Sequence, residues 1–327
     1  MRVYHHAIPS QNGAHPLGGS RVFRFHDVQA RRRDGAVDTL ADADTLARLS
    51  APRRDISGLT LDVPRVMGIL NVTPDSFSDG GDNTDLTTAV DRARAMAKDA
   101  DILDIGGEST RPGAAEVGID EEIRRTAPVI AAIRSAGIQT PISIDTRKAR
   151  VAEAALKAGA NIVNDVSALT FDPNMAALVA ERDVAVCLMH AQGDPEMMQA
   201  DPRYDNVLLD VFDWLERRIV AAEAAGIARD RIIVDPGIGF GKTLQHNLSL
   251  LRGLSLYHDL GLPILLGASR KRFIGTIDEA DEAKDRMAGS VAVALHAAAQ
   301  GAQILRVHDT YETRQALRLQ LALSEVD

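Results

Sequence analysis

From residue 66 onward, short runs rich in Val, Ile and Leu alternate with longer segments rich in Ala, Glu and Arg. Such alternation is typical of repeated βα units, and near-continuous apolar runs suit the strands of a parallel sheet covered on both faces. Eight such units favour a closed barrel, so the sequence predicts an α/β fold of the (β/α)₈ TIM-barrel type. The eight predicted strands are Val66–Asn71, Asp101–Gly106, Pro141–Asp145, Ala160–Asp165, Val184–His190, Arg231–Asp235, Pro263–Gly267 and Gln303–Val307.

The segments between these strands carry Ala, Leu and Val at intervals of three and four residues, which predicts amphipathic helices. They include Thr84–Ala100, Arg147–Ala158, Arg203–Ala225 and Ala280–Gln300. Gly159, Gly226 and Gly301 follow three of them, where glycine supplies the left-handed turn after a helix. An open doubly wound sheet is the competing architecture, but it would normally lack a regular eighth unit and often carries a dinucleotide-binding glycine fingerprint, which is absent here.

Residues 1–60 do not fit the repeat, so we expect a short N-terminal extension of unknown role ahead of a barrel domain at residues 61–327. The extension mixes histidines, glycines and the arginine run Arg31–Arg33 around one predicted strand, Arg21–Val28. A small hairpin that plugs the floor of the barrel and a partly ordered tail are both compatible with this composition.

The charge balance and the single cysteine exclude several function classes. Thirty-seven basic side chains against forty-six acidic ones leave a net charge of -9, so nucleic acid is not an expected partner. Cys187 lies in an apolar run, which predicts a buried thiol rather than a disulfide or a cysteine metal site. No stretch has the composition of a secretory signal or a membrane span, so we expect a cytoplasmic protein without a membrane partner.

Polar side chains gather where the predicted strands end, which is where barrel enzymes place their sites. A single aspartate at such a point can simply cap the next helix. Asp145, Asn164, Asp235 and Lys271 together, however, suit a flat heterocycle with many donors and acceptors, because buried polar groups need partners. The cations that follow the strands predict a bound anion in this acidic protein: Arg111, Lys271, Arg306 and His308.

The glycine run from Asp235 to Lys242 resembles a nucleotide-binding loop at first sight. A Walker motif needs four residues between its glycines, whereas Gly237 and Gly241 enclose three, and residue 236 is proline. A backbone that approaches a ligand closely, with Phe240 as a flat apolar wall, explains the run better.

Two longer segments give a specific family resemblance. Residues 67–81, MGILNVTPDSFSDGG, and residues 106–113, GGESTRPG, resemble the two signatures of the dihydropteroate synthases. Ser143-Ile-Asp-Thr, Ala160-Asn-Ile-Val-Asn-Asp, the glycine run, Ala268-Ser-Arg-Lys and Arg306-Val-His-Asp occur in the order of that family. The resemblance covers about residues 65–315.

The resemblance implies an enzyme that condenses a dihydropterin pyrophosphate with p-aminobenzoate in folate biosynthesis, with Mg²⁺ and as a homodimer. It implies that Asp145, Asn164, Asp235 and Lys271 bind the pterin, with Met189 and Phe240 lining the same pocket. Asn71, Arg111, Arg306 and His308 match the residues that hold the pyrophosphate, and Asn71 also matches a magnesium ligand. Thr110, Pro112, Phe240, Ser269 and Lys271 match the surroundings of p-aminobenzoate. Asp145, Lys271, Arg306 and His308 are therefore the expected catalytic residues.

Two other functions fit part of the pattern. A pterin-dependent methyltransferase acting on a corrinoid protein would need the same aspartates and asparagine, but not the Thr-Arg-Pro loop or the Arg-Val-His ending. A pterin-binding regulatory paralogue would bind ligand without forming product, because a fold and a retained site do not prove turnover.

Overall fold

The computed structural model describes residues 2–38, 41–72, 82–108, 116–192 and 202–324. Eight parallel strands lie in the order β10-β9-β8-β7-β6-β5-β12-β11, and a parallel bridge from Val234 to Ile264 joins the two ends of this sheet. The predicted barrel is therefore confirmed. Its strands are β5 (Arg65–Asn71), β6 (Ile102–Gly106), β7 (Ile142–Asp145), β8 (Ile162–Asp165), β9 (Ala185–Met189), β10 (Ile232–Asp235), β11 (Leu265–Leu266) and β12 (Ile304–Val307).

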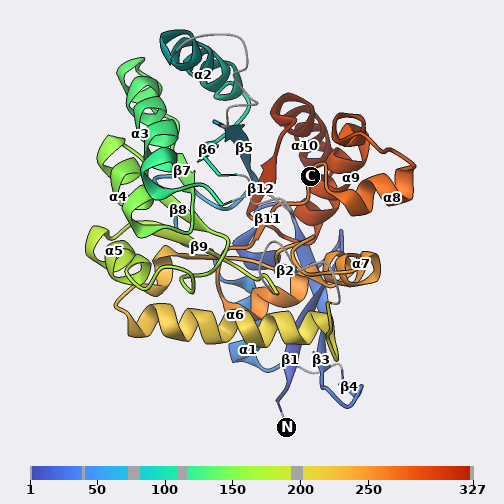
Figure 1. Cartoon of the computed structure of the whole chain (residues 1–327). Helices are drawn as coiled ribbons and strands as arrows, with labels where there is room; N and C mark the ends of the chain where they lie inside the picture. Colours follow the sequence, from blue (N-terminus) through green and yellow to red (C-terminus); the bar gives the residue numbers. More distant parts are fainter. Residues whose placement is uncertain (1, 39–40, 73–81, 109–115, 193–201, 325–327) are drawn as a thin grey trace.

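Helices follow the strands and surround the barrel (Figure 1). They are α2 (Asp82–Met96), α3 (Ile119–Ser135), α4 (Ala149–Ala158), α5 (Met175–Arg182), α6 (Val207–Ala224), α7 (Leu244–Arg252), α8 (Arg272–Asp278), α9 (Met287–Ala299) and α10 (Thr310–Ser324). A 3₁₀ segment, η4 (Leu254–Leu260), lies between α7 and β11. None of the helices in the described ranges is long and apolar enough to cross a membrane.

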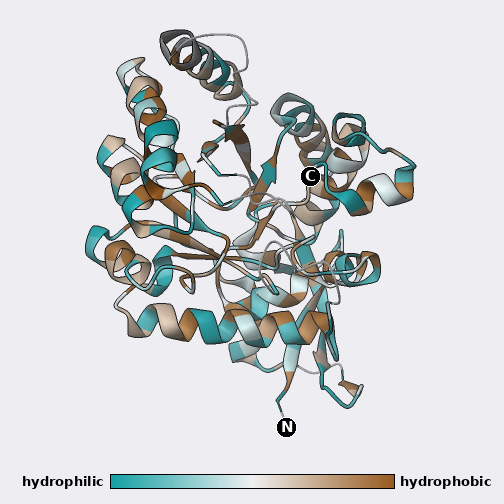
Figure 2. Cartoon of the chain, in the orientation of Figure 1, coloured by the Kyte–Doolittle hydropathy of each residue, from teal (hydrophilic) through white to brown (hydrophobic). Residues whose placement is uncertain are grey.

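Successive side chains of each strand alternate between the barrel interior and the helices. One cluster of buried side chains inside the barrel contains Cys187 together with Met67, Ile102, Ile233 and Ile304. Cys187 is free and buried, as predicted. The strands are largely hydrophobic in Figure 2, whereas the helices carry both hydrophobic and hydrophilic residues along their length.

Element boundaries differ most from the predictions at two places in the barrel. The predicted strand Pro263–Gly267 contracts to the two residues of β11, and the predicted helix Ala280–Gln300 begins only at Met287, after a 3₁₀ turn. The glycine positions were predicted correctly, because Gly159, Gly226 and Gly301 have φ values of 117°, 93° and 85°. These left-handed conformations end their helices.

The N-terminal extension contains more structure than the one strand predicted from the sequence. β1 (Tyr4–Pro9), β2 (His15–Pro16), β3 (Arg24–Arg31) and β4 (Val37–Asp38) form an antiparallel sheet, and α1 (Ala43–Ser50) packs with it. The predicted strand Arg21–Val28 lies three residues too early, because residues 21–23 precede β3. Phe25, Leu17 and Leu49 form a small core of its own.

Residues 56–61 close the floor of the barrel. Ile56 and Leu59 pair in an antiparallel bridge, and Ile56 and Leu61 pack into the interior cluster that contains Met67 and Ile102. This arrangement favours the first alternative for the extension, a hairpin that plugs the floor. The arginine run also has a partner, because Arg33 contacts Asp210 and Asp213 of α6 at 2.7 Å each.

Candidate active site

The carboxyl ends of the eight strands bring the predicted polar residues to one mouth. Asp145 ends β7, Asn164 lies on β8, Asp235 ends β10 and Arg306 lies on β12, while Lys271 follows β11. The side chains of Asp145, Asn164 and Asp235 are all buried. Because the strands are parallel, residues from distant parts of the sequence converge at this single end.

Arg306 is the centre of the charge network in the interior. Its Nε donates to Asp104 Oδ2 at 2.6 Å, and its Nη2 donates to Asp145 Oδ2 at 2.7 Å. Burial raises the pKa of Asp145 to about 7, with the Arg306 charge opposing this shift and the Asp104 charge adding to it. Burial alone would lower the pKa of Arg306, but the two carboxylates raise it above its ordinary value.

Asp104 is a site residue that the sequence prediction missed. It is completely buried in the middle of β6, and its Oδ2 also lies 3.4 Å from the Asn164 Nδ2 donor. The sequence did carry a signal for Asp104, because it is a carboxylate inside the apolar run Ile102–Ile105. A buried carboxylate needs a charged or hydrogen-bonded partner. The sequence could not identify that partner, which comes from the last strand.

Three buried side-chain oxygens near this network have no hydrogen-bond partner among the described residues: Asp104 Oδ1, Asp145 Oδ1 and Ser143 Oγ. Two glycines lie beside this network. A Cβ built on Gly106 would come within 3.5 Å of Asp145, and one on Gly267 would come within 3.6 Å of Arg306 and 3.8 Å of Asp235 Oδ2. Buried acceptors without a protein partner suit a ligand that presents N–H donors.

Lys271, Phe240 and Asp235 form the opposite side of the mouth. The Lys271 ammonium lies 4.4 Å from the centroid of the Phe240 ring and donates to the Ile238 carbonyl. Burial lowers the pKa of Lys271 to about 7, with the Asp235 charge opposing this shift. Burial likewise raises the pKa of Asp235, whose Oδ1 accepts a hydrogen bond from the Gly237 N–H at 2.7 Å.

The loops after β11 and β12 are held together at the rim. The backbone N–H of His308 donates to Ser269 Oγ at 3.2 Å, and His308 Nδ1 lies 3.0 Å from the same oxygen. Arg270 pairs with Asp309 through two hydrogen bonds. The structure thus brings Ser269 and His308 into direct contact at the mouth.

The structure describes Met189 but not the predicted residues of the loop after β6. Met189 ends β9, and a Cβ built on Gly237 would lie 3.3 Å from its Cγ, so it borders the glycine-rich loop. Thr110, Arg111 and Pro112 lie outside the described residues. Asp165, in contrast, has a structural role, because its carboxylate accepts hydrogen bonds from the backbone N–H groups of Ser167 and Leu169.

Asn71 is the predicted magnesium ligand. It ends β5, and its Oδ1 and Asp145 Oδ2 both lie beside Gly106, at 3.7 and 3.8 Å from a Cβ built on that glycine. In the part of the chain that the structure describes, no group of three or more His, Cys, Asp or Glu side chains could hold a metal ion. Mg²⁺ often takes one or two protein oxygens and completes its shell with substrate phosphates and water, so a single amide oxygen at the mouth fits this mode of binding.

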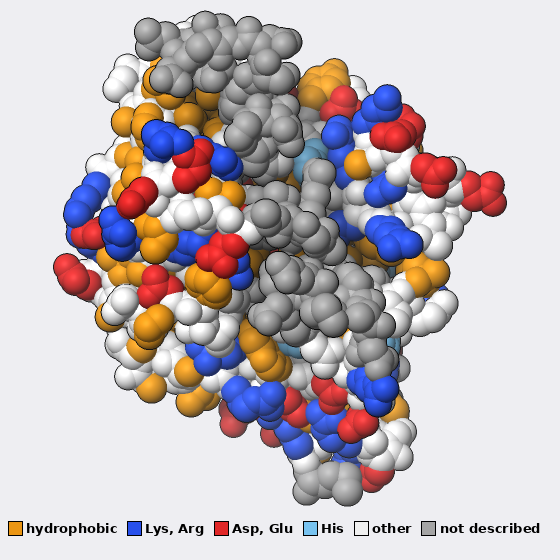
Figure 3. Space-filling view, viewed as in Figure 1, with side chains coloured by type: hydrophobic (Ala, Val, Ile, Leu, Met, Phe, Trp, Pro, Cys, Tyr) orange, Lys and Arg blue, Asp and Glu red, His pale blue; other side chains and the backbone are white. Residues whose placement is uncertain are grey.

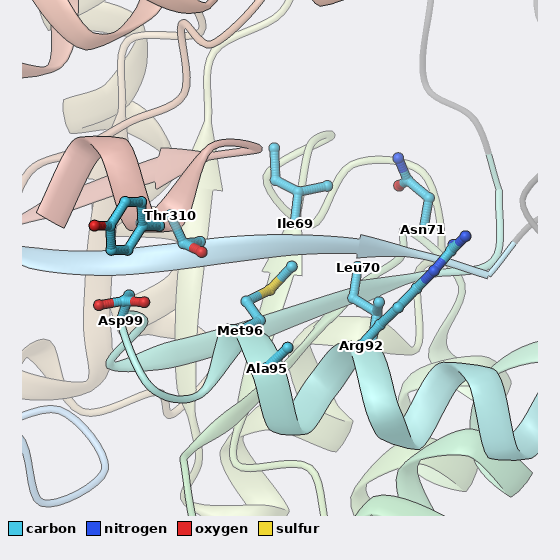
Figure 4. Close-up of a pocket in the computed structure, with 9 residues that line it drawn as sticks. Ile69, Leu70, Asn71, Arg92, Ala95, Met96, Asp99 and Thr310 are labelled. Carbon is cyan, nitrogen blue, oxygen red and sulfur yellow. The ribbon is translucent and has the colours of Figure 1, made fainter.

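A separate groove lies outside the barrel, between β5, α2 and α10 (Figure 4). It encloses a cavity of about 450 Å³. Met96 of α2 points toward β5, and Asn71 lies at the end nearest the barrel mouth. None of the buried aspartates of the mouth lines it, so we place the chemistry inside the barrel.

A (β/α)₈ barrel with buried carboxylates, an amide, a lysine and an arginine at its carboxyl-terminal mouth defines an enzyme that binds a small polar ring beside an anion. Residues 67–308 match the family model described as "Pterin binding enzyme". The chain is 48% identical to the dihydropteroate synthase of Escherichia coli K12 over 264 residues, which are 80% of this chain and 93% of that protein. The chain therefore belongs to the pterin-binding enzyme family and, within it, to the dihydropteroate synthases, which are transferases.

Solved structures give the same result. The Xanthomonas albilineans dihydropteroate synthase with 4-aminobenzoic acid has a TM-score of 0.78 at 48% identity, covering 84% of this chain and 99% of that one. The Yersinia pestis dihydropteroate synthase in a sulfonamide drug complex has a TM-score of 0.77 at 46% identity, covering 82% of this chain and 98% of that one. Both likenesses extend over nearly the whole of the related chains.

Proposed function

We propose that this protein condenses 6-hydroxymethyl-7,8-dihydropterin pyrophosphate with p-aminobenzoate, giving 7,8-dihydropteroate and pyrophosphate on the route to folate. The observation that carries the proposal is the group of buried Asp145, Asn164 and Asp235 with the partly buried Lys271 and Arg306 at one barrel mouth, in a chain that is 48% identical to a dihydropteroate synthase. A structure of the Xanthomonas albilineans relative contains 7,8-dihydropteroate, the product of this reaction.

The pterin ring belongs in the interior beside the unpartnered acceptors. Its N–H groups would pair with Asp235 and Asp145, and Asn164 would offer both a donor and an acceptor to the ring. Lys271 would donate to a ring acceptor, with its ammonium already placed between Phe240 and the Ile238 carbonyl. Met189 and Phe240 would cover the apolar faces of the ring.

The pyrophosphate belongs at the rim, near Asn71 and His308. Arg111 and Arg306 would add positive charge, and Arg306 also favours the charged form of Asp145 by pairing with it. Asn71 would hold Mg²⁺, whose positive charge would offset the negative charge of the leaving group.

The reaction then breaks the bond between the pterin methylene and the pyrophosphate oxygen, and the bonding electrons leave with pyrophosphate. The Asp145 carboxylate would stabilise the electron-poor methylene that remains. The amine of p-aminobenzoate attacks this carbon and loses one proton. Thr110, Pro112, Phe240, Ser269 and Lys271 would surround p-aminobenzoate, and Ser269 would help to bind its carboxylate.

The proposal extends to assembly and location. Large apolar side chains are exposed on α8, α9 and α10, namely Ile277, Met287, Tyr311, Leu319 and Leu323. A second copy of this chain would cover such a surface, so we propose a homodimer, which sedimentation equilibrium would test.

Basic and acidic side chains are interspersed over the described part of the face in Figure 3, which offers no single basic surface for nucleic acid. We place the reaction in the cytoplasm.

A turnover assay with pterin pyrophosphate and p-aminobenzoate tests the function directly. Product formation supports the synthase, whereas ligand binding without product would support a regulatory paralogue. Titration with free pterin and with pterin pyrophosphate separates the synthase from a pterin-dependent methyltransferase. The synthase should prefer the pyrophosphate in the presence of Mg²⁺, and alanine at both Arg306 and His308 should abolish most of that preference.

A further inference from the structure

Lys242 and His190 are two buried ionisable residues to which the proposed reaction gives no role. Lys242 ends the glycine-rich loop after β10, and His190 directly follows β9. Only 3% of Lys242 and 4% of His190 is exposed. Burying a lysine ammonium is costly unless each of its N–H groups finds an acceptor, so the partners of Lys242 define what it does.

The Lys242 ammonium has three acceptors within hydrogen-bonding distance. Its Nζ donates to the Phe240 carbonyl at 2.9 Å and to the His190 carbonyl at 3.4 Å, and it lies 2.9 Å from His190 Nδ1. Burial and the Lys242 charge together lower the pKa of His190, so a neutral ring can accept at Nδ1. One lysine thus joins the glycine-rich loop to the end of β9.

The backbones of these two loops are in close contact at two points. Gly237 and Gly241 have φ values of 68° and 62°. A Cβ on Gly237 would lie 1.9 Å from the His190 carbonyl oxygen, and one on Gly241 would lie 2.4 Å from the Gln192 carbonyl oxygen. Only glycine allows this approach, and the approach places the carbonyl of His190 within reach of the lysine.

Two aromatic residues support the same junction from outside. Tyr204 Oη donates to the Gly241 carbonyl at 2.8 Å. The ring of Trp214, from α6, lies 4.9 Å from the His190 ring at an interplanar angle of 78°. His190 is therefore fixed in position, and the lysine that contacts it is fixed with it.

The segment that Lys242 fixes includes Phe240, which the proposed reaction uses, and a carbonyl that holds Lys271, which the reaction also uses. Phe240 carries one of the three acceptors on its backbone, and its ring faces the Lys271 ammonium at 4.4 Å. Ile238, in the same loop, accepts a hydrogen bond from Lys271. Displacing the loop would move the Phe240 wall and release Lys271 together.

We infer that Lys242 is a positioning residue: it joins the loop after β10 to the end of β9, and so holds Phe240 against the p-aminobenzoate site. His190 acts with it as the fixed acceptor. The inference rests on the proposed synthase function and adds to it a residue pair that acts through Phe240 without touching substrate.

The main test replaces Lys242 by methionine, which keeps the length of the side chain and removes its donors. Steady-state kinetics should show a KM for p-aminobenzoate raised by about tenfold, the equivalent of one charge-assisted hydrogen bond, with a smaller fall in kcat. The affinity for free pterin should fall by a smaller factor than the KM for p-aminobenzoate rises, because Asp235 and Asn164 lie on strands outside the loop and would still bind the ring after Phe240 and Lys271 shift. Lys157→Met is the matched control for loss of a lysine, because the Lys157 side chain is 60% exposed on α4 and pairs with Glu153 on the surface.

A second pair of variants separates positioning from general packing. His190→Asn keeps an acceptor near the position of Nδ1, whereas His190→Leu removes it. The asparagine variant should recover a large part of the p-aminobenzoate affinity that the leucine variant loses. Equal KM values for the two variants would overturn the inference, and this comparison also decides the case if Lys242→Met does not fold.

Other outcomes are equally decisive. Equal weakening of both substrates would indicate a general loosening and overturn the specific assignment, as would a folded Lys242→Met enzyme with an unchanged KM for p-aminobenzoate. Absence of product with the wild-type enzyme would contradict the proposed function itself. An active wild type with unaffected variants would contradict only the role of Lys242.

Discussion

Replacing Arg306 by methionine should destabilise the protein strongly, because two buried carboxylates would lose their shared counter-charge. The guanidinium lies 2.6 Å from Asp104 and 2.7 Å from Asp145, whose side chains are 0% and 7% exposed. Each charge pair contributes about 4 kcal/mol of attraction at an effective dielectric constant of about 20, and desolvation of the charges offsets part of it. Removing one partner of a buried ion pair costs about 3–5 kcal/mol, which is the loss we expect in the free energy of unfolding.

The loss of stability caused by Arg306→Met should be larger at higher pH. A carboxyl whose pKa is raised in the folded state binds more protons there than in the unfolded chain, so stability falls as pH rises between the two pKa values. For wild-type Asp145 this window runs from its ordinary value up to about 7. Without Arg306 the window extends to higher pH, so between pH 6 and 8 the variant should lose at least about 1 kcal/mol more than the wild type.

Urea unfolding at pH 6 and pH 8, with linear extrapolation to water, measures both effects. Arg150→Met is the control, since Arg150 and its partner Asp120 have side chains 65% and 86% exposed and such pairs contribute at most about 1 kcal/mol. The loss of stability for Arg306→Lys should fall between those for Arg306→Met and Arg150→Met. An ammonium keeps the positive charge but lacks the forked guanidinium that reaches both carboxylates. A loss for Arg306→Met no larger than that for Arg150→Met would refute the view that Arg306 balances the two carboxylates.

Three further predictions follow from the same structure. Asp235→Asn should weaken pterin binding by at least about tenfold in calorimetric titration, since an amide presents a mismatched donor. The urea midpoint of this variant should stay near that of the wild type, and an unchanged pterin affinity would remove Asp235 from the pterin site. Sulfonamides should inhibit competitively against p-aminobenzoate if Phe240 and Ser269 line its site, and competition against the pterin substrate alone would contradict that assignment. Ile56→Ala should cost about 2–5 kcal/mol in urea unfolding, because Ile56 is buried in the barrel floor, whereas Val37→Ala on the exposed β4 should cost little.

Most of the barrel was predictable from the sequence because its signals are local. Near-continuous apolar runs identified all eight strands, although Leu265–Leu266 is shorter than the predicted run. The N-terminal sheet was harder to predict. β2 and β4 have only two residues each, and such short strands carry too little periodicity to be read from the chain.

The residues at the barrel mouth could be located because each follows a strand, and parallel strands share one carboxyl-terminal end. Asp145, Asn164, Asp235, Lys271 and Arg306 are all brought there. The role of Lys242 could not be predicted, because the acceptor that identifies it, His190 Nδ1, lies 52 residues away on another loop. Sequence spacing excluded a P-loop but gave no partner for the lysine.

The sequence by itself therefore determined the barrel, the family and the end of the barrel at which chemistry occurs, since hydrophobic period, glycine positions and strand ends are properties of neighbouring residues. Only the tertiary structure decided which charges pair. Arg306 and Asp104 are 202 residues apart, and closure of the sheet places their atoms 2.6 Å from each other. The ionisation of Asp145 depends on that pairing and on burial, and both arise only when the chain has folded.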